Sequence, residues 1–312
     1  MSLAFIFPGQ GSQSVGMGEE MWETFPTARA VFEEVDDALG QKLSAIMFNG
    51  PLEDLTLTAN TQPALMASSV AVMRVLEADF GISVTAASHV AGHSLGEYSA
   101  LCAAGALSLS DTAKLLKLRG EAMQQAVPVG KGAMAALLGA SIEDAQALCD
   151  TVDGIAEIAN DNATGQVVIS GETSAIEAAA EMARDRGIKK AVLLPVSAPF
   201  HCRMMQPAAD TMREALADTD ISAPQVPVVN NVTASPVTDP AQIRDDLVAQ
   251  VTGRVRWRES VMWMADNGVT AMAEPGTGKV LTQMIRRITK DVAGTALSSP
   301  ADLEAFAETI KG

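Results

Sequence analysis

The chain has 312 residues, of which 48% are hydrophobic and 19% are charged, and its formal net charge is −16. A chain of this length can bury a large core, either as one large domain with an insertion or as two domains. The strong negative charge argues against binding to nucleic acid or to an anionic membrane surface, because both repel an acidic protein.

Neither a targeting segment nor a membrane span is predicted. The first apolar run, residues 3–7, is too short for a signal peptide and lacks a basic flank, and no apolar stretch approaches transmembrane length. The three cysteines, Cys102, Cys149 and Cys202, form no C-x-x-C motif and no paired framework, which indicates reduced thiols. These features predict a soluble, cytoplasmic protein.

The first strand is predicted at the apolar run 3–7, which is typical of a buried parallel strand. It leads into the small-residue loop 8–13. Gly9 and Gly11 resemble the start of a dinucleotide-binding fingerprint, but Ser14 stands at the third glycine position. A flexible loop at the carboxyl edge of a sheet is therefore the better interpretation. Helices are predicted next at 26–39, from Thr61 to about residue 80, and from a Ser110-Asp111 cap to about residue 127.

Residues 90–98 predict the end of a strand, a sharp turn and the start of a helix. Gly92, Ser94 and Gly96 form the G-x-S-x-G pattern of a nucleophile elbow, in which the two glycines let neighbouring backbones pass without a Cβ clash. The turn also puts Ser94 at a helix N-terminus, where free amide N–H groups can stabilise an oxyanion. The same pattern arises by chance in small-residue turns, so by itself it supports both interpretations equally.

From residue 132 the pattern changes to β-α-β-β-α-β, which predicts an inserted ferredoxin-like unit. Residues 128–130 and Pro195 lie at its edges as candidate hinges. We therefore expect an α/β protein with a larger α/β-hydrolase-like parallel-sheet domain, residues 1–130 and 196–312, and a ferredoxin-like subdomain, residues 131–195. The predicted strands of the insertion are 133–138, 155–160, 166–170 and 191–194, and its predicted helices are 141–150 and 174–186.

The remainder of the chain returns to the parent pattern. Gly278-Lys279 is not a phosphate-binding loop, because Ala273 stands where that motif needs glycine and Val280 where it needs serine or threonine. The predicted elements are helices at 207–217, 239–250 and 280–290 and strands at 226–229 and 270–273.

A nucleophilic serine needs a base, and the chain has three histidines. His89 lies in the strand before the elbow and is expected to be structural. His93 is adjacent to Ser94 on the sharp turn, so its side chain should point away. His201 follows a strand in a proline-flanked loop, where a parallel sheet presents catalytic groups, and it is the preferred base over a surface-loop histidine.

Two further features bear on the chemistry. Arg119 falls on the apolar side of its predicted helix, which indicates either a structural ion pair or a site for a substrate carboxylate. Carboxylates between Ser94 and His201 fall mostly in the insertion, so the third member of a hydrolase triad is missing. A backbone carbonyl could orient the imidazole instead, and this departure argues against simple ester hydrolysis.

Five segments, in order along the whole chain, resemble the malonyl-CoA:acyl carrier protein transacylase family. These segments are 8–13, 92–98, 118–120, 165–171 and 197–201. The resemblance implies a ping-pong cycle of fatty acid biosynthesis, in which malonyl passes from malonyl-CoA to Ser94 and then to the phosphopantetheine thiol of acyl carrier protein. It implies no metal and no tightly bound cofactor, and we expect a monomer.

The resemblance also implies a role for each matching position. Ser94 would be the nucleophile and His201 its base, and Arg119 would bind the malonyl carboxylate. The backbone N–H groups of Gln10 and Leu95 would form the oxyanion hole. The remaining positions are Gln250, whose backbone carbonyl would orient the histidine, and Asn160 and Asn162, which would line the site.

Two other functions are compatible with this pattern, namely a serine esterase or thioesterase of similar architecture and a non-catalytic subunit that binds a carrier protein. The intact Ser94, His201 and Arg119 argue against the second. Docking an acidic carrier on an acidic enzyme needs a local basic face. Two clusters are candidates for it, although each could be an ordinary solvated face: Lys279, Arg286, Arg287 and Lys290, and Arg184, Arg186, Lys189 and Lys190.

Overall fold

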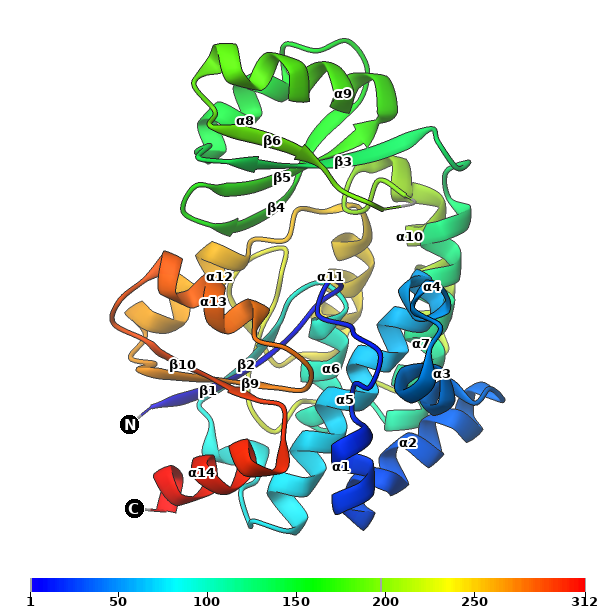
Figure 1. The fold of residues 1–312 in the computed structure, drawn as a ribbon, viewed down its shortest axis with the longest axis vertical. Helices are drawn as coiled ribbons and strands as arrows, with labels where there is room; N and C mark the ends of the chain where they lie inside the picture. The colour runs from blue at the N-terminus through cyan, green and yellow to red at the C-terminus, as the bar shows by residue number, and fades with distance from the viewer. Residues whose placement is uncertain (1, 197, 312) are drawn as a thin grey trace.

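The computed structural model describes residues 2–196 and 198–311, so Ser197 of the fifth motif lies outside the described residues. The strands form two sheets, and α12 and α13 lie between them (Figure 1). The larger sheet has the order β10 (Ala293–Leu297), β9 (Ala271–Pro275), β1 (Leu3–Phe7), β2 (His89–Gly92), β7 (Val228–Val229) and β8 (Pro236–Val237). All of its pairs are parallel except β7 with β8.

Strand β1 is central to the larger sheet and is buried on both faces, as its unbroken apolar run predicts. Phe5 and Phe7 face one core, whereas Ala4 and Ile6 face the other, because successive side chains of a strand point to opposite faces. The second core is completed by α12 (Trp257–Asp266) and α13 (Val280–Ile288). The first is completed by α1 (Glu19–Thr24), α2 (Pro26–Leu39), α3 (Leu43–Asn49), α4 (Leu52–Thr56), α5 (Thr58–Ala78), α6 (Gly96–Ala103), α7 (Leu109–Gln125), α10 (Gln206–Ala217), α11 (Pro240–Thr252) and α14 (Pro300–Lys311).

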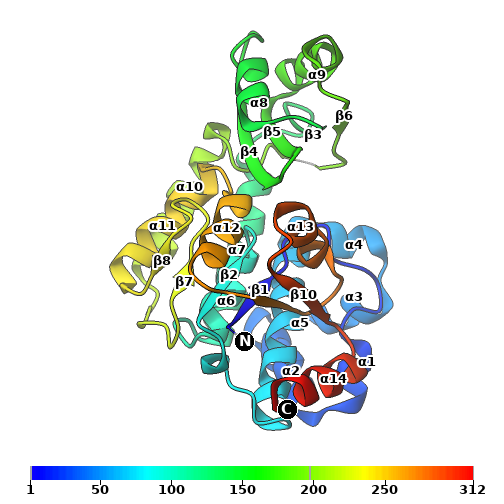
Figure 2. The same cartoon turned by 90° about the vertical axis from the view of Figure 1, so that its left-hand side faces the viewer.

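The smaller sheet is antiparallel and forms a lobe at the end of the molecule opposite the two termini (Figure 2). Its order is β4 (Ala156–Ala163), β5 (Gln166–Glu172), β3 (Gly132–Leu138) and β6 (Lys190–Leu193). Helices α8 (Ile142–Cys149) and α9 (Thr173–Met182) cover its outer face. Met134 and Val168 lie on its inner face and pack with the core of the larger part. The inner face is therefore turned towards the larger sheet, where it can line a site between the two.

A backbone bridge fastens β4 to the segment before α12, and an ion pair fastens it to α12 itself. Asp161 N donates to the Val255 carbonyl at 2.9 Å, and Val255 N donates to the Ala159 carbonyl at 2.8 Å. The carboxylate of Asp161 is 2.8 Å from the guanidinium of Arg258. Asp161 is buried, and therefore this pair is less screened by solvent than a surface pair. The contact holds the inner face of the smaller sheet over the larger one.

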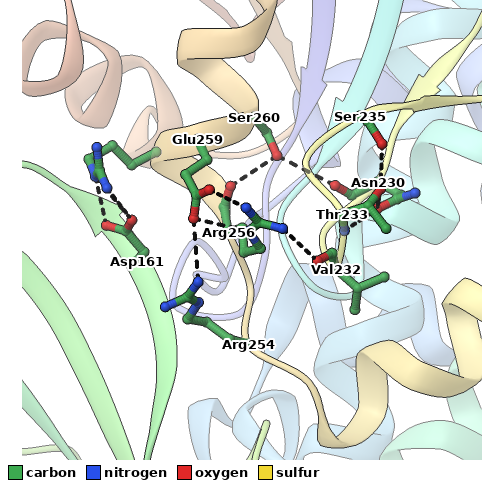
Figure 3. A network of polar contacts seen from close by, with 10 residues as sticks. Asp161, Asn230, Val232, Thr233, Ser235, Arg254, Arg256, Glu259 and Ser260 are labelled. Atoms are coloured by element: carbon green, nitrogen blue, oxygen red, sulfur yellow. Dashed lines mark hydrogen bonds and ion pairs between the residues drawn. The ribbon is translucent and has the colours of Figure 1, made fainter. Parts of the chain in front are cut away.

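The loop after β7 is tied to the same segment (Figure 3). Glu259 lies between Arg254 and Arg256 and forms ion pairs with both. Arg256 in turn donates to the Val232 carbonyl at 3.2 Å, and its amide N–H donates to the Asn231 carbonyl at 3.0 Å. These contacts fix the position of residues 230–232, which reach the back of the nucleophile elbow.

Two predicted details were wrong. Ser108 rather than Ser110 caps α7, because Ser108 Oγ accepts from the amide of Asp111 at 3.0 Å while Ser110 Oγ donates to Glu34 on α2. The predicted connection 161–165 is largely strand, since β4 continues through two register shifts to Ala163 and leaves a turn at 164 and 165.

Candidate active site

The elbow is a point where three backbone segments touch. Ser94 has φ 54°, a left-handed conformation that is strained for a residue with a Cβ. A Cβ on Gly92 would lie 1.9 Å from the carbonyl of Gly96, and a Cβ on Gly96 would lie 2.2 Å from the Phe7 carbonyl oxygen. Glycine is therefore required at both positions for the ends of β1 and β2 and the start of α6 to pack together.

Ser94 and His201, which are 107 positions apart, form a hydrogen bond at the centre of the site. Ser94 Oγ is 2.7 Å from His201 Nε2. His201 Nδ1 is 2.9 Å from the Gln250 carbonyl oxygen and 3.2 Å from that of Gly253. Carbonyl oxygens only accept, so the network assigns the proton to Nδ1 and leaves the Nε2 lone pair to accept from the serine hydroxyl.

The position of Gln250 explains how a carbonyl can serve His201. Gln250 lies in the last turn of α11, where backbone carbonyls have no partner within the helix. His201 is itself 4% exposed, and burial lowers its pKa to about 3, with the nearby charge of Arg119 acting in the same direction. The imidazole is therefore neutral near pH 7, as a general base must be.

Arg119 projects from α7 into the site and is 1% exposed. Its guanidinium donates to Gln62 Oε1 at 2.6 Å, to Gln250 Oε1 at 2.8 Å and to Ser94 Oγ at 3.3 Å. Across residues 2–196 and 198–311, no carboxylate lies within ion-pair distance of Arg119. The structural ion pair considered from the sequence is thus absent from the described residues, and the charge faces the nucleophile.

A second group of buried polar residues holds the elbow from behind, and sequence reasoning missed it. The amide of Ser94 donates to Asn231 Oδ1 at 2.7 Å, and Asn231 Nδ2 donates to the Gly92 carbonyl at 2.6 Å. Glu97 Oε2 accepts from the backbone amide of Asn231 at 3.0 Å and from Gln250 Nε2 at 2.8 Å. Glu97 belongs to the elbow motif, which was a usable signal, whereas nothing local to Asn231 or Gln62 pointed to the site.

Ser94 opens onto a cavity of about 180 Å³ between the two sheets. Gln10, Leu95, Asn160 and Asn162 all line it, together with apolar side chains from the inner face of the smaller sheet. Within the described part of the chain, neither the Gln10 amide nor the Leu95 amide donates a hydrogen bond. A Cβ on Gly9 would lie 2.7 Å from the His93 carbonyl oxygen, so glycine lets the 8–13 loop pass beside the elbow.

The other two histidines do not contact Ser94. His93 lines the same cavity, but its Nε2 is 2.8 Å from Asn162 Oδ1, and burial lowers its pKa. His89 lies at the start of β2, packs edge-on against Trp263 and contacts Ser88 Oγ at 3.1 Å. Neither is placed to take a proton from the serine.

The residues of both basic clusters are exposed, and one hydrogen bond and one register row of the smaller sheet connect the two clusters. Arg287 on α13 donates to Gln166 Oε1 at 3.1 Å. Gln166 and Lys190 are both register partners of Leu138, so they occupy one row across β5, β3 and β6. Adjacent strands are about 4.8 Å apart, which places Lys190 about 10 Å from Gln166. One turn before Arg287, Met284 lines the cavity.

Two other kinds of feature, a metal site and a membrane-spanning helix, are absent from the described residues. Among residues 2–196 and 198–311, no group of three or more histidine, cysteine, aspartate or glutamate side chains is arranged to hold a metal ion. No helix in the described part of the chain is long and apolar enough to cross a membrane.

Comparison with known proteins gives consistent matches over almost the whole chain. Residues 4–302 match the acyl transferase domain family. The malonyl CoA-acyl carrier protein transacylase of Bacillus subtilis (strain 168) is 44% identical over 312 residues, covering 99% of this chain and 97% of that protein.

Solved structures agree with the sequence matches. The crystal structure of an acyl-carrier-protein-S-malonyltransferase from Bartonella henselae matches with a TM-score of 0.98 at 55% identity and covers 100% of both chains. A malonyl-transacylase in complex with its type II polyketide acyl-carrier protein matches with a TM-score of 0.96 at 41% identity, covering 99% of this chain and 100% of that one.

Proposed function

This chain belongs to the acyl transferase family and, within it, to the malonyl-CoA:acyl carrier protein transacylases, and we propose that it transfers malonyl through an ester on Ser94. The observation that carries this assignment is the 2.7 Å contact between Ser94 Oγ and His201 Nε2, with Arg119 3.3 Å from the same oxygen. One nucleophile thus has both a base and a cation beside it. The reaction belongs to fatty acid biosynthesis.

In the first half-reaction, His201 Nε2 takes the hydroxyl proton of Ser94 as Oγ attacks the thioester carbonyl of malonyl-CoA. The oxyanion of the tetrahedral intermediate accepts hydrogen bonds from the backbone amides of Gln10 and Leu95. The carbon–sulfur bond then breaks, and the CoA sulfur leaves with the proton from His201. The products are CoA and malonyl-Ser94, and the enzyme is ready for its second substrate.

In the second half-reaction the phosphopantetheine thiol of acyl carrier protein gives its proton to His201 Nε2 and attacks the ester carbonyl. The ester bond breaks, and Ser94 Oγ recovers the proton from His201. No protein carboxylate is needed to orient the base, because the carbonyls of Gln250 and Gly253 hold Nδ1–H. The network around His201 therefore supports transfer without an acidic triad member.

The substrate carboxylate is assigned to Arg119. Its fork geometry suits a carboxylate, and the described residues leave it without an anionic partner. Asn160 and Asn162 are assigned to the wall of the acyl site, and the contact of Asn162 with His93 keeps that wall in place.

We further assign carrier docking to the strip of surface between the two basic clusters, in particular to Arg287 on α13 and Lys190 on β6. The support is the contact of Arg287 with Gln166, the register row that Gln166 shares with Lys190, and the place of Met284, one turn before Arg287, in the cavity lining. An acidic carrier would be steered to this strip despite the net charge of −16.

The proposal also covers the domain architecture, the cellular location and the oligomeric state. The strand order β4-β5-β3-β6 supports a ferredoxin-like subdomain at 131–195, inserted in a hydrolase-like domain of 1–130 and 196–312. The three cysteines are buried and free, which supports the reducing cytoplasm as the location. The monomeric state remains a prediction.

Intact-mass analysis after mixing with malonyl-CoA tests the assignment. The protein should gain one malonyl group, peptide mapping should place it on Ser94, and Ser94→Ala should abolish it. A malonyl group found on Cys102 or Cys202 would refute the mechanism. Rapid release of CoA with free malonate, in the absence of carrier protein, would instead favour the esterase alternative.

A further inference from the structure

We propose that Glu97 is a positioning residue that maintains the preference of the site for an acyl group with a terminal carboxylate, acting on Arg119 through the side-chain amide of Gln250. The proposal rests on the assignment of Arg119 as the carboxylate-binding residue. Glu97 lies on the first turn of α6 and is 2% exposed, behind the nucleophile.

Arg119 is held by neutral acceptors. Two amide oxygens, Gln62 Oε1 and Gln250 Oε1, accept from its two terminal nitrogens at 2.6 and 2.8 Å. Burial lowers the pKa of Arg119, and the charge of Glu97 is one of the influences that raise it again. Glu97 does not contact Arg119 directly, because the side-chain amide of Gln250 lies between them. The guanidinium is oriented, and its charge is left for a substrate carboxylate.

This arrangement works only while the oxygen of the Gln250 amide faces Arg119. An amide can turn over with almost no change of shape, and the reversed amide would place N–H groups against the guanidinium N–H groups. Two acceptors at the other end prevent the reversal. Gln250 Nε2 donates to Glu97 Oε2 at 2.8 Å and to the Ser94 carbonyl oxygen at 2.9 Å. Without Glu97, only the carbonyl would select the orientation.

The same carboxylate oxygen accepts a second bond, from the backbone amide of Asn231 at 3.0 Å. Both donors therefore meet one atom, Oε2, and the side chain of a glutamine at position 97 could offer its single oxygen to both. Burial raises the pKa of Glu97 to about 7, and a protonated carboxyl would likewise keep one oxygen free to accept. The orientation of the Gln250 amide thus depends on an acceptor oxygen at the position of Glu97 Oε2 and not on the charge of that side chain.

The experiment compares Glu97→Ala with Glu97→Gln, using the ratio of kcat/KM for malonyl-CoA to that for acetyl-CoA. Acylation of Ser94 is followed by quenched-flow intact mass spectrometry. The ratio does not depend on how much of the protein is folded, so lowered stability cannot imitate the effect. Glu97→Ala should lower the ratio by about tenfold or more, and Glu97→Gln should keep it within about threefold of the parent.

Asp36→Asn is the matched control. Asp36 is 4% exposed, accepts from Ser44, and lies on α2, outside the cavity. Its replacement removes a comparably buried carboxylate and should leave the ratio unchanged. In a Gln250→Met background, which keeps the backbone carbonyl for His201, Glu97→Ala should have no further effect on the ratio, because the amide that transmits it is gone.

Two results would overturn the proposal. The first is an unchanged ratio in Glu97→Ala, which includes an equal loss for both acyl groups, and the second is a loss in Glu97→Gln as large as in Glu97→Ala. Arg119→Ala separates this failure from failure of the proposed function. If Arg119→Ala collapses the ratio and Glu97→Ala does not, only the role of Glu97 is wrong. If Arg119→Ala leaves the ratio intact, the assignment of the carboxylate site is wrong.

Discussion

Lowering the pH should leave acylation of Ser94 almost unaffected down to about pH 5. The cause is the pKa of His201, which burial and the charge of Arg119 hold at about 3. At pH 5 an imidazole with the ordinary pKa of 6.5 would be about 97% protonated, and the rate would fall about 30-fold. With a pKa of about 3, about 1% is protonated at pH 5, and the loss is less than about twofold.

The same shift makes the fold sensitive to acid. His201 has a folded-state pKa below its unfolded value of 6.5, so its contribution to stability is fully present above pH 6.5 and is lost as the pH falls towards 3. At about 1.4 kcal/mol per unit, a shift from 6.5 to about 3 corresponds to a loss on the order of 5 kcal/mol, a large part of a typical stability of about 5–15 kcal/mol. Glu97 acts in the opposite direction, because its raised pKa gives a contribution that is present below pH 4.5 and lost as the pH rises through about 7.

The measurement is the rate of the first malonyl-enzyme burst between pH 4.5 and 8, with thermal melts at each pH to define where the protein stays folded. His89→Gln is the control, since it removes a histidine that does not contact Ser94. Its profile should superimpose on that of the parent. A fall in the burst rate with a midpoint near pH 6.5, in protein that is still folded, would refute the neutral buried base.

The remaining predictions concern the carboxylate site, the elbow and the docking strip. Arg119→Ala should lower malonyl relative to acetyl transfer by about ten- to a hundredfold, and Arg119→Lys should recover only part of it because an ammonium lacks the fork; initial rates with both CoA esters check this. Gly96→Ala should abolish acylation and lower the melting temperature, because its Cβ would lie 2.2 Å from a backbone oxygen; melts and intact mass report both. Reversing Arg287 and Lys190 to glutamate should raise the KM for carrier protein and leave malonylation by malonyl-CoA nearly unchanged, and unaltered carrier kinetics at low salt would place docking elsewhere.

The parts of the site that sequence predicted are those with a local signal. The spacing of Gly92, Ser94 and Gly96 specifies a turn within one short segment, and the structure shows the close approaches that require these glycines. His201 could be selected because the chain has three histidines and loop position separates them. The role of Gln250 was implied by the family resemblance, and it concerned only the backbone carbonyl of this residue. Its side-chain contacts could not be foreseen, since they join residues 131 and 153 positions apart.

Four of the helices that were not predicted from the sequence share a physical feature. None of α1, α3, α4 and α12 has a side-chain hydrogen bond at its N-cap, and the cap residues are glycine, lysine, proline and arginine. A start signal of serine, threonine, aspartate or asparagine was therefore absent. For α12 the start is held instead by tertiary contacts of Arg256 and by burial of Trp257. Its omission mattered, because this helix and the segment before it anchor both the smaller sheet and the loop of Asn231.

If Arg119 binds the substrate carboxylate, as proposed above, its polar shell explains selectivity as well as position. If a protein carboxylate contacted this buried guanidinium, it would neutralise the positive charge. That carboxylate would then compete with any anionic substrate for the guanidinium. Here the buried carboxyl group of Glu97 is separated from the guanidinium by the Gln250 amide, which orients Arg119 without forming an ion pair with it. A malonyl group brings the missing anion, whereas an acetyl group leaves a desolvated charge facing a methyl group. Among the described residues, the charge of Arg119 thus has no ion-pair partner beside the nucleophile, and on the proposed assignment the acyl group that completes the pair should bind best.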